Sequence, residues 1–291
     1  ELLRVKTKFM GDVTLHRAHM ASSASLSPAS SRVVAPSTRR RCTRRASSSS
    51  VSTRCAAEAG GTIRREVLDR GDRGKINTVD DRNWYSQPRL CTHVDDEFLA
   101  QLTQLYRERI PPGGKVLDMC SSWISHLPPE VEYSEVVGHG LNAEELGKNK
   151  RLSRFFVKNL NVDPSFAAED KTYDAVVCCV SVQYLQRPEE VFAEVYRVLK
   201  PGGVFIVSFS NRMFYEKAIA AWRDGSGFSR AQLVKQYFQC VSGFTQAEVI
   251  TEVGVTPDDS LVGKLKKFMK RSSSDPFYAV VGYRNYKRVD E

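Results

Sequence analysis

A loop rich in hydroxyl and titratable side chains follows a short apolar run near the middle of the chain. The run Val116-Leu117 leads into Asp118, and the next eight residues are Met-Cys-Ser-Ser-Trp-Ile-Ser-His, ending at His126. Such a run predicts a strand, and ligands of open α/β sheets bind beyond the carboxyl ends of the strands. His126 could therefore act as a general base or contact a cofactor, and a structural histidine bonded to the loop backbone is the alternative.

The elements that position this loop are clearest in the second half of the chain. Apolar runs over 175–180 and 204–209 predict two strands, and neither run alternates polar and apolar residues. Strands of that kind are covered on both faces, as in a parallel sheet. Between them, a proline followed by two glutamates is typical of a first helical turn and predicts a helix over 188–199. A Lys-Pro-Gly-Gly turn is expected to end it.

This strand-helix-strand unit resembles the second half of class I S-adenosylmethionine-dependent methyltransferases. The resemblance lies in Tyr-Asp-Ala-Val-Val at 173–177 and Leu-Lys-Pro-Gly-Gly at 199–203. The sequence Ser-Ser-Trp-Ile-Ser-His-Leu-Pro at 121–128 is similar to a group of type 11 methyltransferase-like proteins of bacteria and plastids, and this resemblance covers nearly all of residues 78–284. It implies an α/β fold, a Rossmann-like seven-stranded, mainly parallel sheet with an antiparallel last strand and helices on both faces.

The resemblance also implies a site for S-adenosyl-L-methionine, with departures from the usual pattern. Cys120 and Ser122 stand where most members have glycines, and Gly140 stands where an acid usually binds the ribose hydroxyls. Because charge-assisted hydrogen bonds are the stronger ones, we expect a lowered affinity for adenosine. Asn159 replaces an acid that accepts the adenine amino proton. The predicted cofactor-binding residues are Asp118, Cys120, Ser121, Ser122, His139, Gly140, Asn142, Asn159, Leu160 and Ser181.

Residues ahead of the first strand fall where methyltransferases usually place a lid over the substrate. Arg89 could bind an anionic group, and His93 could accept a proton. Trp123 is expected to be a buried wedge between loop and helix rather than a ring that stacks on adenine. Asp95 and Asp96 are expected to cap a helix over 97–107. The predicted catalytic residues are His126, His93 and Tyr85.

The formal net charge of +9 does not indicate a nucleic-acid partner, because the whole excess lies in residues 1–55 and the remainder of the chain is neutral. Residues 20–55 contain no acid and are rich in serine, alanine and arginine, which is typical of an organelle transit peptide. We predict import into the chloroplast stroma, with the mitochondrion or a basic RNA-binding tail as alternatives. The expected domains are a leader over 1–55, an N-terminal extension with lid helices over 56–112, and a methyltransferase-like domain over 113–285.

Other segments complete the predicted domain. Helices are expected over 213–223 and 229–242, and strands over 244–251 and 277–283. A basic amphipathic helix over 260–271 could dock on a membrane surface, although such a charge run is usually a solvated face. No apolar stretch has the length of a membrane span. The seven cysteines lack the spacing of a zinc site, so we predict free thiols and no metal.

These patterns favour one function and leave an alternative open. The leading hypothesis is a plastid S-adenosylmethionine-dependent methyltransferase that acts on a small molecule. The alternative is a catalytically silent methyltransferase-like module that binds a ligand or a protein partner. A dinucleotide dehydrogenase is less well supported, because the chain lacks the Gly-x-Gly-x-x-Gly turn. The sequence names neither the methyl acceptor nor the oligomeric state.

Overall fold

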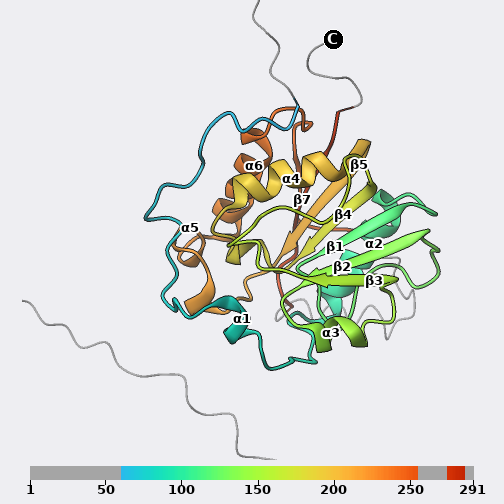
Figure 1. The fold of residues 1–291 in the computed structure, drawn as a ribbon, viewed down its shortest axis with the longest axis horizontal. Helices are drawn as coiled ribbons and strands as arrows, with labels where there is room; N and C mark the ends of the chain where they lie inside the picture. Colours follow the sequence, from blue (N-terminus) through green and yellow to red (C-terminus); the bar gives the residue numbers. More distant parts are fainter. Residues whose placement is uncertain (1–59, 255–273, 286–291) are drawn as a thin grey trace, which may run out of the picture. The chain divides into compact units, whose positions relative to one another are not determined.

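The structure, a computed structural model, describes residues 60–254 and 274–285 and is built on one sheet of seven strands (Figure 1). Their order is β3-β2-β1-β4-β5-β7-β6; the pairs from β3 to β5 are parallel, and β7 is antiparallel to both of its neighbours. This confirms the predicted fold class. The strands are β1 (Lys115–Met119), β2 (Glu135–Gly140), β3 (Arg154–Val157), β4 (Tyr173–Cys179), β5 (Leu199–Phe209), β6 (Glu248–Ile250) and β7 (Tyr278–Tyr283). The predicted leader and the basic segment 260–271 lie outside the described residues.

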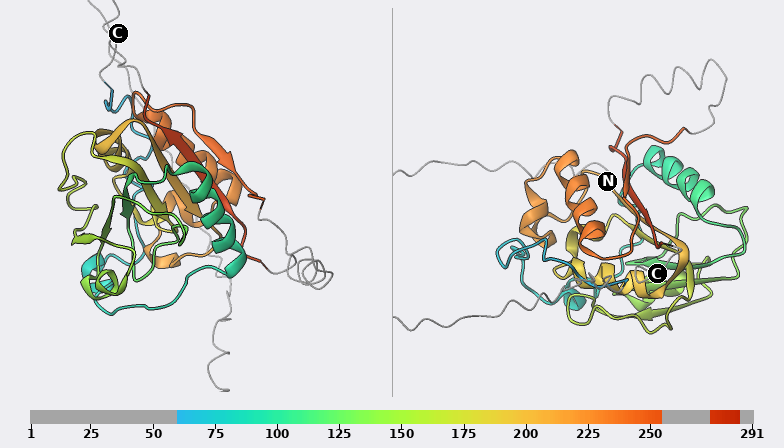
Figure 2. Two further views of the ribbon diagram at one scale, coloured as in Figure 1. Left: turned by 90° about the vertical axis from the view of Figure 1, so that its right-hand side faces the viewer. Right: turned by 90° about the horizontal axis from the view of Figure 1, so that it is seen from above.

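Helices pack on both faces of the sheet, as the long apolar strands require. One face is covered by α2 through Phe98 and Leu102, and the other by α4 and α6 through residues such as Phe192 and Phe238 (Figure 2). Among the described residues, no helix combines the length and apolarity needed to cross a bilayer. The helices are α1 (Asp81–Trp84), α2 (Asp96–Arg109), α3 (Ala143–Lys148), α4 (Pro188–Val198), α5 (Ala220–Arg223) and α6 (Gly227–Cys240), with 3₁₀ turns at Val182–Tyr184 and Tyr215–Lys217.

Local sequence signals account for the helix starts. Asp95 caps α2 by accepting a hydrogen bond from the backbone N–H of Phe98, and Pro188 begins α4. The Lys-Pro-Gly-Gly turn was predicted to separate α4 from the next strand, but β5 begins directly after α4, at Leu199. Leu199 already pairs with Tyr173, and the Lys-Pro-Gly-Gly residues form a bulge before the pairing resumes at Val204.

The predicted helix over 213–223 was wrong. The structure has only a 3₁₀ turn and the short helix α5 in this region. The N–H of Ile219 donates to the carbonyl of Gln183, outside the segment, at 3.0 Å, and the side chain of Lys217 is buried. Contacts with distant parts of the chain therefore replace the hydrogen bonds that would continue a helix.

A buried ionic cluster fixes α1 against the domain. The carboxylate of Asp81 pairs with the ammonium groups of Lys75 (2.7 Å) and Lys217 (2.9 Å), and it accepts a hydrogen bond from Asn161 (2.9 Å). All three charged side chains are largely buried. Because Asn161 follows β3 and Lys217 follows β5, this cluster holds the N-terminal segment beside the carboxyl ends of the strands.

Candidate functional site

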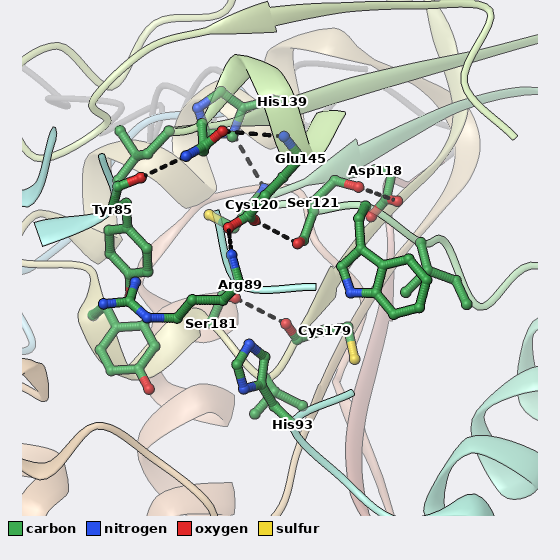
Figure 3. A pocket seen from close by; sticks show the side chains of 18 of the residues that line it. Tyr85, Arg89, His93, Asp118, Cys120, Ser121, His139, Glu145, Cys179 and Ser181 are labelled. Carbon is green, nitrogen blue, oxygen red and sulfur yellow. Dashed lines mark hydrogen bonds between the residues drawn. The ribbon is translucent and has the colours of Figure 1, made fainter. Parts of the chain in front are cut away.

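A pocket of about 340 Å³ lies at the carboxyl ends of the parallel strands, between the loop after β1 and the segment that precedes α2 (Figure 3). All thirteen residues predicted to bind the cofactor or to act in catalysis line it. The structure thus brings them together, and their individual roles remain predictions. They are Tyr85, His93, Asp118, Cys120, Ser121, Ser122, His126, His139, Gly140, Asn142, Asn159, Leu160 and Ser181.

Serine hydroxyls hold the loop after β1, where related folds use glycines. The buried carboxylate of Asp118 accepts hydrogen bonds from the hydroxyls of Ser121 (2.6 Å) and Ser125 (2.5 Å). Asn149 donates from Nδ2 to the carbonyl of Ser122 and to the hydroxyl of Ser125, both at 3.0 Å. Burial raises the pKa of Asp118 to about 6, although the two hydroxyls oppose this shift. Side-chain hydrogen bonds therefore determine the course of this loop.

The same loop explains the glycine at the predicted ribose position. A β-carbon on Gly140 would lie 2.6 Å from the carbonyl oxygen of Ser121, so no side chain fits there. Two hydrogen bonds keep the loop in place, from the N–H of Ser121 to the carbonyl of His139 (2.7 Å) and from the N–H of Cys120 to Nδ1 of His139 (3.2 Å). The loop occupies the space that an acidic side chain at position 140 would need.

His139 and Asn142 both form hydrogen bonds within the protein. Nε2 of His139 lies 2.9 Å from the carbonyl of Lys158, and Nδ1 accepts a hydrogen bond from the N–H of Cys120, so both ring nitrogens are engaged. Asn142 caps α3 by accepting from the N–H groups of its first turn, and its Nδ2 donates to the carbonyl of Tyr85 at 2.8 Å. The structure uses both side chains to join segments of the protein.

Glu145, in the first turn of α3, lines the pocket and was not predicted as a site residue. Its buried carboxylate accepts a hydrogen bond from the hydroxyl of Ser122 (2.5 Å) and from the backbone N–H of Arg89 (2.7 Å). In the sequence, an acid three residues after a capping asparagine indicates only a stable helix start. Nothing local distinguishes it from its exposed neighbour Glu144.

An aromatic cluster around Phe214 forms the wall opposite the loop. The guanidinium of Arg89 lies 5.2 Å from the ring centre of Phe214 and 5.4 Å from that of Tyr85, and the ring of His93 packs 5.5 Å from Phe214 (Figure 3). Burial lowers the pKa of His93, so its imidazole is neutral at neutral pH and can accept a proton. Burial raises the pKa of Tyr85 well above its usual value, so the phenol stays protonated and is no base.

His126 and Trp123 complete the rim on the loop side. Burial lowers the pKa of His126 to about 4, so this imidazole is also neutral at neutral pH. Trp123 is only half-buried, which corrects the predicted buried wedge, and its Nε1 donates to the carbonyl of Cys91 at 3.2 Å. This hydrogen bond to Cys91 connects the loop after β1 with the N-terminal segment.

The remaining predicted residues come from the loops after β3 and β4. Asn159 accepts a hydrogen bond from the N–H of Asn161 at 3.0 Å, which leaves its Nδ2 and one lone pair of Oδ1 for a ligand. Leu160 is buried beside it. Ser181 donates to the carbonyl of Cys179 at 2.9 Å.

Residues 124–207 match a family model described as a methyltransferase domain. The chain is 31% identical over 132 residues to sterol methyltransferase-like 2 of Botryococcus braunii, and 30% identical over 122 residues to squalene methyltransferase 1 of the same organism. These alignments cover 42% and 39% of this chain, but 33% and 32% of the relatives. The chain thus spans about a third of the length of the curated relatives it matches.

Solved structures are similar at low sequence identity. A structure described as the complex of the Haloferax volcanii Trm112 methyltransferase activator and the putative methyltransferase is 15% identical, with a TM-score of 0.47 over 65% of this chain and 91% of that one. A putative S-adenosylmethionine-dependent methyltransferase from Listeria monocytogenes is 14% identical, with a TM-score of 0.45 over 66% and 100%. The match of residues 124–207 is to a methyltransferase domain, and the strand order and directions agree with those that the resemblance to class I methyltransferases implied.

Proposed function

We propose that this protein is an S-adenosylmethionine-dependent methyltransferase that acts on a small molecule. The observation that carries the proposal is the pocket at the carboxyl ends of β1 to β4, which is lined by the serine loop and the aromatic wall. Its volume of about 340 Å³ is in the range of small-molecule sites. The match of residues 124–207 to a methyltransferase domain supports the same reaction.

The polar groups of the pocket fit the cofactor in chemical type. S-adenosylmethionine presents an ammonium group, two ribose hydroxyls and an adenine amino group, all of which are hydrogen-bond donors. The side-chain acceptors that line the pocket include the carboxylates of Asp118 and Glu145 and the amide oxygen of Asn159. We assign these three to the ammonium, the ribose and the adenine respectively. Glu145 thereby supplies the acid that position 140 cannot hold.

The cofactor would supply an electrophilic methyl group, and the chain would position the acceptor and manage its proton. Displacement at a methyl carbon depends mainly on holding the reactants in line and close together. Tyr85 and Arg89 line the pocket, and we assign to their segment the task of limiting the access of water to the bound acceptor. Neutral His93 is the residue we assign as proton acceptor when the acceptor atom carries a hydrogen.

An apolar acceptor agrees best with the wall of the pocket. Tyr85, Tyr184 and Phe214 present rings to the cavity, and Met213 adds a thioether. The curated relatives carry the names of sterol and squalene methyltransferases, and both of those names refer to large apolar molecules. We propose the plastid as the setting because of the composition of residues 20–55. A fluorescent protein fused behind residues 1–55 tests this, and cytosolic fluorescence would contradict it.

Calorimetric titration of the full chain tests the central proposal. We expect S-adenosylmethionine and S-adenosylhomocysteine to bind, and adenosine alone to bind more weakly. If neither cofactor form binds at millimolar concentration, the enzyme proposal fails. The alternative of a silent binding module then becomes the better account.

The pH dependence of cofactor binding gives a more specific prediction. Burial raises the pKa of Asp118 to about 6, and an ammonium group bound beside it favours the carboxylate. We expect the Kd of S-adenosylhomocysteine to fall as pH rises from about 5 to about 7, with proton release on binding. Without ligand, the contribution of Asp118 to stability has the opposite trend and is lost as pH rises through about 6. A pH-independent Kd, or a Kd in Asp118→Asn with the same pH profile, would contradict the assignment.

A further inference from the structure

Among the described residues, three cationic side chains line the pocket, and they differ in how they are paired. Lys158 pairs with Asp163 at 2.6 Å, and Arg212 pairs with Asp275 at 2.7 Å. In the same part of the chain, no carboxylate lies within ion-pair distance of the guanidinium of Arg89. The roles assigned so far to the residues of the pocket leave this positive charge unused.

The hydrogen bonds of the Arg89 side chain are incomplete as well. A guanidinium carries five N–H donors. Nη2 donates to the carbonyl of Trp84 at 3.1 Å, whereas Nη1 is buried and has no hydrogen-bond partner within the described part of the chain. Because a charged donor without an acceptor is costly to bury, this arrangement indicates that an acceptor comes from a ligand.

Arg284 shows how an arginine with a structural role is satisfied in this protein. Its guanidinium lies 4.4 Å from the ring centre of Tyr196, and its Nη1 donates to the carbonyls of Tyr196, Arg197 and Leu199 at 2.7–3.1 Å. Arg89 also lies over aromatic rings, but no carbonyl of the described residues accepts a hydrogen bond from its Nη1. Contact with rings therefore does not explain why the N–H donors of Arg89 lack acceptors.

Aromatic rings fix the guanidinium of Arg89 on the pocket wall that we assign to the methyl acceptor. Its central carbon lies 5.2 Å from the ring centre of Phe214 and 5.4 Å from that of Tyr85 (Figure 3). Phe214, which follows β5, packs 6.1 Å from Tyr184, which follows β4. An anion bound by this guanidinium would lie beside rings that suit an apolar body.

The charge of Arg89 matches a carboxylate better than a phosphate. The planar guanidinium can donate two parallel hydrogen bonds to the two oxygens of a carboxylate, and one positive charge then balances one negative charge. A phosphate monoester carries about −1.5 to −2 charges at pH 7. Its excess negative charge would lie near Glu145, whose carboxylate accepts a hydrogen bond from the backbone N–H of Arg89 at 2.7 Å.

We propose that the methyl acceptor is an apolar molecule that carries a carboxylate, and that Arg89 binds this carboxylate. The inference rests on the proposed methyltransferase function and adds the chemical class of the acceptor. Arg89 is a specificity-determining residue, because a neutral or cationic acceptor would leave its guanidinium desolvated and unpaired. The aromatic wall binds the apolar body, and the ion pair sets which end of the acceptor faces the methyl group.

Calorimetry with matched small ligands tests this proposal on the full chain saturated with S-adenosylhomocysteine. Phenylacetate, phenylacetamide and phenethylamine share an aromatic body of similar size, and they are anionic, neutral and cationic respectively. We expect phenylacetate to bind at least about tenfold more tightly than either of the others, because hydrogen bonds between charged partners are the stronger ones.

Three variants assign the preference to one side chain. Arg89→Gln should abolish the preference for the anion while S-adenosylhomocysteine still binds. Arg212→Gln is the matched control and should keep the preference, because Arg212 lines the same pocket but already pairs with Asp275. Arg89→Lys keeps the charge and loses the planar fork, so it should retain part of the preference, and it serves as the second variant if Arg89→Gln fails to fold.

Three results would overturn the assignment of Arg89. The first is that the wild type binds S-adenosylhomocysteine but binds phenylacetate no better than phenylacetamide, or binds neither. The second is a preference for phenethylamine, which would show that the rings select a cation. The third is a loss of about tenfold or more in the affinity of Arg89→Gln for S-adenosylhomocysteine, which would mean that Arg89 binds the carboxylate of the cofactor. Failure of S-adenosylhomocysteine to bind the wild type would instead contradict the methyltransferase function itself.

Discussion

Replacing Glu145 with glutamine is expected to weaken the binding of S-adenosylhomocysteine by about 10- to 100-fold, because hydrogen bonds to a charged group contribute about 1.5–3 kcal/mol. The substitution keeps the size of the side chain and one acceptor oxygen, but it removes the charge that we assign to the ribose hydroxyls. The loop after β1 prevents an acid at position 140, so no neighbouring group replaces it there. Calorimetry on the wild type and on Glu145→Gln measures the change.

Two comparisons separate contact with the ribose from a loss of structure. Glu144→Gln is the matched control, since Glu144 is exposed on the same helical turn and pairs with Lys148; we expect no change in affinity. An S-adenosylhomocysteine analogue that lacks the ribose 2′-hydroxyl should bind wild type weakly and should lose little further affinity in Glu145→Gln. If the substitution weakens the analogue and the parent ligand equally, Glu145 acts only by holding Ser122 and Arg89 in place.

Replacing Asp81 with asparagine is expected to lower the free energy of unfolding by about 3–5 kcal/mol, because it leaves two buried ammonium groups without their carboxylate. Burial by itself would raise the pKa of Asp81, but Lys75 and Lys217 outweigh it, and the pKa falls below its usual value. The stabilisation from this group is therefore present above pH 3.8 and is lost as pH falls through the lower pKa of the folded state. Urea denaturation followed by circular dichroism at neutral pH measures the loss.

Asp80 provides the control for this cluster. It is exposed, caps α1 and pairs with Arg82, so Asp80→Asn should lower the free energy of unfolding much less than Asp81→Asn does. We also expect Asp81→Asn to remove part of the acid sensitivity of the wild type, since the group that titrates is gone. Equal denaturation midpoints for the two variants would show that the buried cluster contributes no more than a surface pair.

The fold could be predicted well because its signals are local. Uninterrupted apolar runs identified β4 and the last part of β5, and the proline with two acids placed the start of α4 within one turn. The prediction of a helix over 213–223 was wrong because the structure of this segment depends on contacts with distant residues. Lys217 bonds to residues 79–81 and the N–H of Ile219 donates to the carbonyl of Gln183, and no local pattern reveals these partners.

The candidate site divides in the same way between what is local and what is not. The sequence alone determined that the loop after β1 contains serines rather than glycines, and that β2 does not end in an acid. Both findings depend only on which residue stands at a known position. Only the tertiary structure explains why β2 ends in a glycine: the carbonyl of Ser121 fills the space that a side chain at position 140 would need. It also decided that Glu145 faces the pocket while Glu144 faces solvent. Parallel pairing of strands far apart in the sequence creates these contacts, and sequence spacing does not encode them.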